Sequence, residues 1–221
     1  MKKETYISVS TDPIKEYQTI FEYAKEMQGK ADFLHCDVMD GKFVPKQTFD
    51  YQLVANINQN SGIMLDVHLM CSEPLSSLED YIDAGANIIT VHYEAFEDKN
   101  NLMLVSNLLK KNGILAGISI NPSTKVKDIK IYLHNFDVVL VMGVVPGESG
   151  QKFMRDTLEK VKTLNEIRKN NNYKYKIEVD GGINLDNAKE IVDAGADMLV
   201  SGSYVYYAQD HLKAVDSLKN L

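Results

Sequence analysis

Two stretches of the chain share one pattern, A-G-A-N-I-I-T-V at residues 84–91 and A-G-A-D-M-L-V-S at residues 194–201. In each stretch an A-G-A triplet precedes an apolar run. Glycine readily adopts the left-handed conformation that ends many helices, and a short apolar run is typical of a buried strand. The repeated joint therefore predicts recurring units in which a helix leads into a strand, rather than two unlike domains.

Eight short apolar runs alternate with longer amphipathic segments along the chain. We expect strands at residues 6–10, 31–37, 63–70, 87–92, 114–120, 137–142, 174–180 and 197–201. The segments between them repeat apolar residues with a helical period, as at Leu158, Val161, Leu164 and Ile167. Alternating strands and helices imply a parallel sheet. Eight such units in 221 residues predict an α/β fold, a single (β/α)8 TIM barrel that forms one catalytic domain over residues 1–221. An open doubly wound sheet is the alternative, but the first strand is not followed by the glycine-rich loop that such a sheet would carry.

Composition narrows the class of protein. Hydrophobic residues make up 44% of the chain, which is enough for a large core, and the net charge is -7. An acidic chain without a basic stripe is a poor ligand for nucleic acid, and no apolar run reaches the roughly 20 residues that span a bilayer. The N-terminus does not resemble a secretory signal, and Cys36 and Cys71 are too few for a disulfide scaffold. We expect a cytoplasmic protein whose partners include neither nucleic acid nor membrane.

Two imidazoles and two carboxylates lie at the ends of the expected strands. They are His35 and Asp37 in H-C-D-V-M-D-G, His68 in D-V-H-L-M, and Asp180 in E-V-D-G-G. Active sites of barrels lie at the carboxyl ends of the strands, and side chains two residues apart on a strand point the same way. Mixed imidazole and carboxylate ligands suit one divalent metal ion, Zn, Fe(II), Mn or Co. The two carboxylates also form a candidate acid/base pair. His92, at the end of another strand, is expected to support this site rather than to bind substrate.

Three glycine-containing loops follow the last three expected strands. They are P-G-E-S-G at residues 146–150, D-G-G at 180–182 and S-G-S at 201–203. Glycine lets backbone N–H groups approach an anion closely, and in barrels the loops after strands seven and eight often bind phosphate. Because these loops contain no lysine or arginine, the anion would be held by backbone amides and by Ser203, at the start of a helix. The pattern favours a small phosphate-bearing substrate.

These motifs resemble the ribulose-phosphate 3-epimerase family. H-C-D-V-M-D-G-K-F-V-P, L-D-V-H-L-M, V-M-G-V-V-P-G-E-S-G-Q-K-F, I-E-V-D-G-G-I and V-S-G-S follow the order of the family's signatures, from about residue 8 to residue 206. The resemblance implies an isomerase of carbohydrate metabolism, in the pentose phosphate pathway. It would epimerise C3 of a ketose phosphate, first of all D-ribulose 5-phosphate to D-xylulose 5-phosphate. The implied mechanism is two-carboxylate proton transfer through a metal-stabilised enediolate. A homo-oligomer is also implied.

The resemblance assigns roles position by position. His35, Asp37, His68 and Asp180 would bind the metal, zinc being one candidate, and Asp37 and Asp180 would also move protons. The methionines would crowd the reacting carbons, and the glycine loops would bind the phosphate. The implied substrate-binding residues are Ser8, Met39, His68, Met70, Met142, Gly147, Glu148, Ser149, Gly150, Gly181, Gly182, Gly202 and Ser203.

The chain departs from the family pattern in three places. Glu148-Ser149 replaces the usual F-G of G-F-G-G, Lys42 and Lys46 replace a His and an Asn that flank F-V-P, and the first strand is one residue short. The shortening leaves open whether Ser8 or Ser10 contacts the substrate.

Two alternatives to the leading function follow from these departures. One is a 3-epimerase of a six-carbon ketose 6-phosphate such as allulose 6-phosphate, and the other is a sugar-phosphate-binding barrel without turnover. Barrel decarboxylases are disfavoured, because the chain lacks their D-x-K-x-x-D array.

Overall fold

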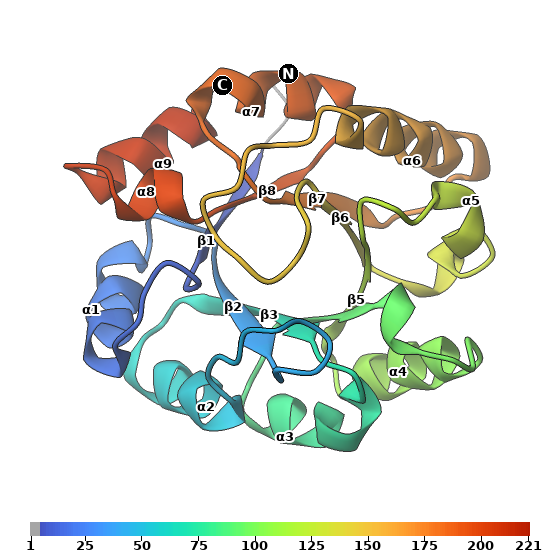
Figure 1. Cartoon of the computed structure of the whole chain (residues 1–221), viewed down its shortest axis with the longest axis horizontal. Coiled ribbons are helices and arrows are strands. Elements are labelled where there is room, and N and C mark those ends of the chain that lie inside the picture. Colours follow the sequence, from blue (N-terminus) through green and yellow to red (C-terminus); the bar gives the residue numbers. More distant parts are fainter. Residues whose placement is uncertain (1–4) are drawn as a thin grey trace.

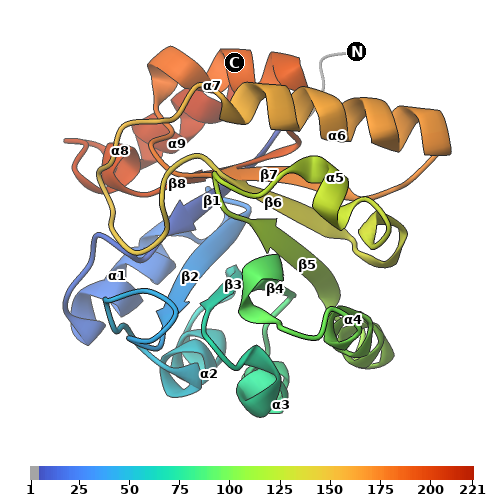
Figure 2. The ribbon, with the colours of Figure 1, turned by 45° about the vertical axis from the view of Figure 1, so that its right-hand side comes forward.

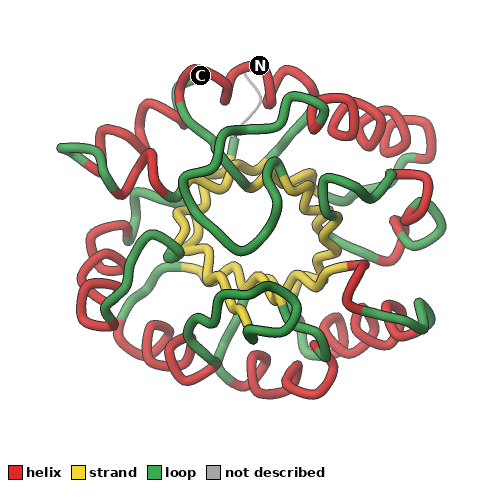
Figure 3. The backbone as a smooth tube through the Cα atoms, viewed as in Figure 1, coloured by secondary structure: helices red, strands yellow, loops and turns green. Residues whose placement is uncertain are grey.

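The computed structural model describes residues 5–221, which form a closed barrel of eight parallel strands (Figure 3). Each strand pairs with the next in chain order, and the eighth pairs with the first. The strands are β1 (Tyr6–Ser10), β2 (Phe33–Met39), β3 (Met64–Met70), β4 (Ile88–His92), β5 (Leu115–Ile120), β6 (Val138–Met142), β7 (Lys176–Asp180) and β8 (Met198–Ser201). The predicted (β/α)8 barrel is confirmed. The predicted domain limits of 1–221 include residues 1–4, which lie outside the described residues.

Helices surround the barrel on all sides (Figures 1 and 2). They are α1 (Tyr17–Met27), α2 (Tyr51–Asn60), α3 (Leu78–Asp83), α4 (Asn101–Lys111), α5 (Val126–Ile129), α6 (Thr157–Asn171), α7 (Leu185–Ala194), α8 (Ser203–Tyr206) and α9 (His211–Lys219). Three short 3-10 turns, η1 (Pro74–Ser77), η2 (Tyr93–Ala95) and η3 (Leu133–Asn135), complete the connections. Among residues 5–221, none of the helices has both the length and the apolar character that crossing a membrane requires.

The two A-G-A joints are built alike. Gly85 and Gly195 follow α3 and α7 with φ of +90° and +129°, a region that favours glycine. An asparagine of the preceding helix packs over each of them, Asn58 of α2 over Gly85 and Asn165 of α6 over Gly195. A Cβ atom at either glycine would lie 2.0 or 2.3 Å from the amide nitrogen of that asparagine. Both joints therefore require glycine for its backbone conformation and for space.

A polar residue just before each even-numbered strand closes the amino end of the barrel. Its side-chain oxygen accepts a hydrogen bond from the backbone N–H of the second residue of the preceding strand, over 2.7 to 3.0 Å. These residues are Asp32, Asn87, Asp137 and Asp197. The sequence pattern counted these four residues as part of the strands, but in the structure each of them lies one residue before its strand. Strand ends are commonly uncertain by a residue or two. Several strands therefore begin one or two residues after the predicted position.

The barrel interior is filled in layers. Phe33, Ile88, Val138 and Met198, from the four even-numbered strands, form an apolar floor, as alternate strands do in barrels of this type. The larger core lies between the outer face of the strands and the helices, and it includes Cys36 and Leu34. Toward the carboxyl ends of the strands the interior becomes polar, so the floor supports the site from below.

Candidate active site

The four predicted metal ligands come together at the carboxyl end of the barrel. In β2, His35 and Asp37 alternate with the outward-facing Cys36, and in β3 the register pairs Asp37 with His68. Asp180 is the last residue of β7. Both imidazoles are fully buried, whereas the side chains of Asp37 and Asp180 are 6% and 17% exposed. The strand alternation therefore turns all four side chains into the barrel, where the imidazoles are buried and the carboxylates remain slightly exposed.

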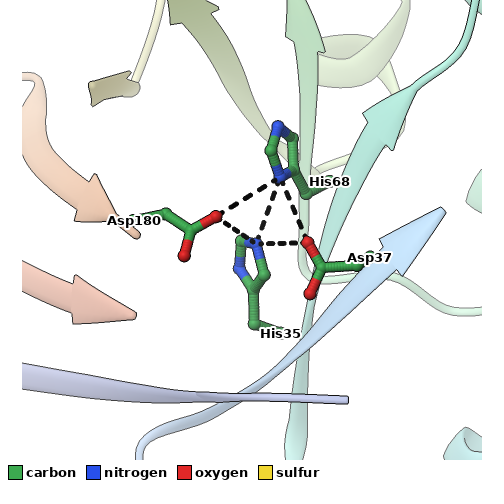
Figure 4. A group of neighbouring side chains, drawn as sticks. All are labelled: His35, Asp37, His68 and Asp180. Atoms are coloured by element: carbon green, nitrogen blue, oxygen red, sulfur yellow. Dashed lines mark hydrogen bonds and ion pairs between the residues drawn. The ribbon is translucent and has the colours of Figure 1, made fainter. Parts of the chain in front are cut away.

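Figure 4 shows Asp37 and Asp180 on opposite sides of the two imidazoles. His35 Nε2 lies 3.5 Å from Asp37 Oδ1 and 4.0 Å from Asp180 Oδ2, and His68 Nδ1 lies at the same two distances. The two nitrogens are 3.3 Å apart. Each of the four residues thus offers one donor atom, and these atoms all lie within 4.8 Å of one another.

The far nitrogens of the imidazoles are held by other side chains. His35 Nδ1 lies 2.6 Å from Asp66 Oδ2, and His68 Nε2 lies 2.8 Å from His92 Nε2. His92 Nδ1 in turn lies 3.3 Å from Glu94. If each of these far nitrogens of His35 and His68 carries a proton, the near nitrogens aim two lone pairs at the same point. As predicted, His92 supports His68.

The donor set fits one divalent metal ion. Ligand atoms about 2.0–2.1 Å from a tetrahedral zinc ion lie roughly 3.3–3.4 Å apart, and the separations between 3.3 and 4.0 Å are close to this. Two imidazole lone pairs facing each other at 3.3 Å would repel without a cation between them. The partners at the far nitrogens are also the arrangement that orients histidine ligands in metal sites. The cluster can therefore hold a metal ion, and its chemistry does not single out one element.

Burial and neighbouring charges shift the pKa values of Asp37 and Asp180 in opposite directions. Burial raises the pKa of Asp180 to about 7, with the charge of Asp37 adding to the rise and His35 opposing it. Burial also opposes ionisation of Asp37, but His35 and His68 outweigh it and hold the pKa of Asp37 well below its usual range. Burial lowers the pKa of His68 to about 4, which keeps this imidazole neutral. Acids with separated pKa values suit acid/base catalysis, and a bound cation would favour the ionised form of both.

A cavity of about 340 Å³ opens above these residues. Its lining contains Asp37 and Asp180 but neither His35 nor His68. It also contains most of the predicted substrate-binding residues, namely Met39, Met70, Met142, Gly147, Glu148, Ser149, Gly150, Gly181, Gly182, Gly202 and Ser203. The methionine side chains form its apolar wall, and the acids lie at its base.

The loops after β6, β7 and β8 meet on one side of the cavity. A Cβ atom at Gly150 would lie 3.8 Å from Ser203 Oγ, and one at Gly182 would lie 2.5 Å from the backbone nitrogen of Phe153. The helix α8 begins at Ser203 as expected, but it has only four residues. Glu148 is exposed, and it also lines the cavity. The three loops therefore form one wall of the cavity, where Gly150 and the hydroxyl of Ser203 lie close together.

The structure places Ser10, not Ser8, at the cavity. Ser8 is fully buried beneath the site, where its hydroxyl donates to Asp66 over 3.1 Å. Ser10 lines the cavity and donates to Asp37 Oδ2 over 2.7 Å. Both side chains point into the barrel, but the register pairs Ser8 with Phe33 of the floor and Ser10 with His35. Of the two serines that the sequence left open, Ser10 is therefore the one placed at the cavity, and its contact with a substrate stays a prediction.

Two buried acids below the site, Asp66 and Glu178, were not among the residues predicted from the sequence. Asp66 and Glu178 are both fully buried, and Asp66 and His35 alone among the described residues join Glu178 in a second cluster of possible ligands. Burial and then the charge of Asp66 raise the pKa of Glu178 well above its usual range. The strand alternation that placed His68 and Asp180 inside the barrel would also have placed these acids there, because each lies two residues earlier on the same strand.

The fold and the site define the class of protein. It is a barrel that can hold a metal ion between two imidazoles and two acids, beside a cavity that three glycine-containing loops line. The family model described as "Ribulose-phosphate 3 epimerase family" matches residues 8–206. The chain belongs to this family.

Individual relatives agree with this assignment. The chain is 40% identical to the ribulose-phosphate 3-epimerase of Aquifex aeolicus, over 88% of this chain and 86% of that protein. It is 39% identical to the ribulose-phosphate 3-epimerase of Bacillus subtilis, over 87% and 88%. The solved structure of 3-keto-L-gulonate-6-phosphate decarboxylase from Vibrio cholerae superposes with a TM-score of 0.73 over 99% and 97%. At 13% identity, that likeness concerns the fold alone.

Proposed function

We propose that the protein epimerises C3 of D-ribulose 5-phosphate to give D-xylulose 5-phosphate. The observation that carries this proposal is the placement of Asp37 and Asp180 on opposite sides of the imidazole pair at the base of one cavity. Epimerisation requires removal of the C3 proton from one face and delivery of a proton to the other. Relatives named ribulose-phosphate 3-epimerase support the choice of substrate.

The chain's own residues divide the work as follows. One carboxylate accepts the C3 proton, and the other, protonated, donates a proton from the opposite face; the roles exchange in the reverse reaction. A positioned acid or base of this kind contributes roughly 10²–10⁴-fold to the rate. Ser10, by donating to Asp37 Oδ2, leaves Oδ1 directed at the site. A divalent cation held by His35, Asp37, His68 and Asp180 would polarise the neighbouring carbonyl and offset the negative charge of deprotonation.

The remaining lining residues hold the substrate. Met39, Met70 and Met142 are buried and apolar, so they exclude water from the carbon that is deprotonated. Backbone amides of the loops after β6, β7 and β8, together with Ser203, would bind the phosphate. The cavity, at about 340 Å³, lies at the small end of the range for ligand sites and suits a five-carbon sugar phosphate.

A proton NMR exchange assay in heavy water tests the function. The protein is mixed with D-ribulose 5-phosphate and, separately, with a six-carbon ketose 6-phosphate, each with and without a chelator. We expect deuterium at C3 and formation of the epimer from the five-carbon substrate, with loss of both in the chelator. A higher kcat/KM on the six-carbon sugar would assign the six-carbon ketose phosphate as the substrate. No exchange on either sugar would indicate a sugar-phosphate-binding protein without turnover.

Several finer properties stay predictions. Zinc, Fe(II), Mn and Co all suit the donor set, and zinc is one candidate among them. We also propose a single domain, because all eight strands belong to one closed sheet. A homo-oligomer, a role in the pentose phosphate pathway and a cytoplasmic location rest on the family resemblance and on the sequence. Size-exclusion chromatography and metal analysis would test the oligomer and the ion.

A further inference from the structure

Asp12 lies where three loops of the barrel mouth meet. It follows β1, its side chain is 8% exposed, and it lines the cavity. Its carboxylate accepts a hydrogen bond from Lys46 Nζ, in the loop after β2. Ser149, in the loop after β6, lines the same cavity as Asp12, and its side chain is one of the groups that act to lower the pKa of the Asp12 carboxyl. Asp12 thus lies between three segments that are far apart in the sequence.

Lys46 provides the positive charge that Asp12 requires. A largely buried carboxylate is costly unless it is paired, and Asp12 also feels the negative charge of Asp37. Among the ion pairs of residues 5–221, Asp12 takes part in the one with Lys46. Removing the ammonium group would leave Asp12 facing Asp37 without compensation, so its side chain would turn toward solvent.

The position of Asp12 is linked to the proposed acid/base residue. The backbone N–H of Asp12 donates to Ser10 Oγ over 3.0 Å, and Ser10 Oγ donates to Asp37 Oδ2 over 2.7 Å. Ser10 is buried, with 5% of its surface exposed. A shift of Asp12 therefore reaches the Asp37 carboxylate through two hydrogen bonds.

The segment of residues 143–156 crosses the opening of the barrel (Figures 1 and 3). Gln151 Nε2 donates to the carbonyl oxygens of Val145 and Glu148, which keeps the segment compact. At Gly147 the segment packs so closely on Val44 that an added Cβ would lie 3.2 Å from Val44 Cβ. Val44 and Lys46 belong to the same loop, so this loop contacts the segment both directly and through Asp12.

One residue from each departure from the family pattern lies near Asp12. Lys46, Ser149 and the end of the shortened first strand all adjoin Asp12. We propose that Lys46 is a positioning residue: with Asp12 and Ser149 it fastens the segment 143–156 over the bound sugar phosphate and, through Ser10, aligns Asp37. This role rests on the proposed function for its kinetic consequences, but the fastening itself does not depend on turnover.

The test uses Lys46→Met, Ser149→Ala and the double variant of the full-length protein. Lys42→Met is the matched control, because Lys42 lies in the same loop, has an exposed side chain, and contacts Asp40 through its backbone N–H. For Lys46→Met we expect KM for D-ribulose 5-phosphate to rise about tenfold, the effect of losing one charge-assisted hydrogen bond. We expect kcat to fall several-fold, and Lys46→Arg to restore both. The double variant should be no worse than Lys46→Met, because both changes release the same contact.

Hydrogen exchange measured by mass spectrometry reports on the fastening without turnover. Backbone amides of residues 143–156 should exchange faster in Lys46→Met and Ser149→Ala than in the native protein or Lys42→Met. Equal exchange in all four proteins would overturn the proposal, as would equal kinetic losses in Lys46→Met and Lys42→Met. Strictly additive effects in the double variant would also overturn it. Faster exchange in a protein that turns over no ketose phosphate would support the fastening and reject the proposed function instead.

Discussion

Replacing Asp66 by asparagine removes a negative charge beneath the imidazole pair and preserves the shape of the side chain. Asp66 is fully buried, lies 2.6 Å from His35 Nδ1 and accepts a hydrogen bond from Ser8 over 3.1 Å. Asparagine can still accept from His35, but a neutral oxygen makes His35 Nε2 less basic. Because Nε2 is a proposed metal ligand, Asp66→Asn should weaken metal binding without contacting the ion.

The size of the effect can be estimated from the contact. Loss of such a partner of a ligating histidine costs typically 10–100-fold in metal affinity, or about 1.4–2.7 kcal/mol. The N···O distance of 2.6 Å marks a strong charge-assisted hydrogen bond, so we expect the upper part of this range. The free energy of unfolding without metal should also fall, by roughly 1–3 kcal/mol, because the buried contact between His35 and Asp66 loses its charge. Metal affinity is therefore compared where both proteins are folded.

Competition with a chromophoric chelator measures the affinity for Zn²⁺ or Co²⁺. Ser119→Ala is the control, because Ser119 is equally buried inside the barrel and its hydroxyl makes no hydrogen bond within residues 5–221. We expect native affinity in Ser119→Ala and weaker binding in Asp66→Asn, with activity restored by added metal. Native affinity in Asp66→Asn would refute the role given to Asp66, and equal losses in both variants would attribute the effect to general disturbance of the interior.

Three further predictions follow from the same structure. Chelation should lower Tm by roughly 5–10 °C, because an ion at about 100 times its Kd stabilises the folded protein by about 2.7 kcal/mol; superimposable melting curves would contradict the metal site. Burial raises the pKa of both Cys36 and Cys71 to about 12. Both thiols therefore stay protonated at about pH 8 and should react with a thiol reagent only in denaturant; rapid labelling of the native protein would be inconsistent with this. Gly182→Ala should lower the free energy of unfolding more than Gly113→Ala, as urea titration would show. Both glycines have positive φ, but an added Cβ would meet Phe153 at 2.5 Å only in the first; equal losses would argue against the close approach.

Local patterns predicted the fold because they depend on neighbouring residues. Apolar periodicity located all eight strands, but most predicted strands begin one or two residues too early. Asn87 and Asp197, for example, lie just before their strands and accept hydrogen bonds from the neighbouring strand. The alternation of side chains placed His35 with Asp37 inside the barrel. It could equally have revealed Asp66, which lies two residues before His68.

Depth in the barrel could not be predicted in the same way. Ser8 and Ser10 share one face of β1, and only the register against β2 shows that Ser10 reaches the cavity. That register arises from pairing between segments that are distant in the sequence. The meeting of Lys46, Asp12 and Ser149 depends similarly on the conformations of three loops, for which a single sequence offers no periodic signal.

The most direct test of the central claim follows each proposed acid/base residue separately. Metal-saturated Asp37→Asn and Asp180→Asn are each incubated in heavy water with D-ribulose 5-phosphate and with D-xylulose 5-phosphate, and deuterium at C3 of the recovered sugar is measured by NMR. Each variant retains one carboxylate, so we expect it to exchange the C3 proton of one sugar only, a different one in each variant, with no interconversion. Exchange of the same sugar by both variants, or continued interconversion by either, would contradict proton transfer from opposite faces.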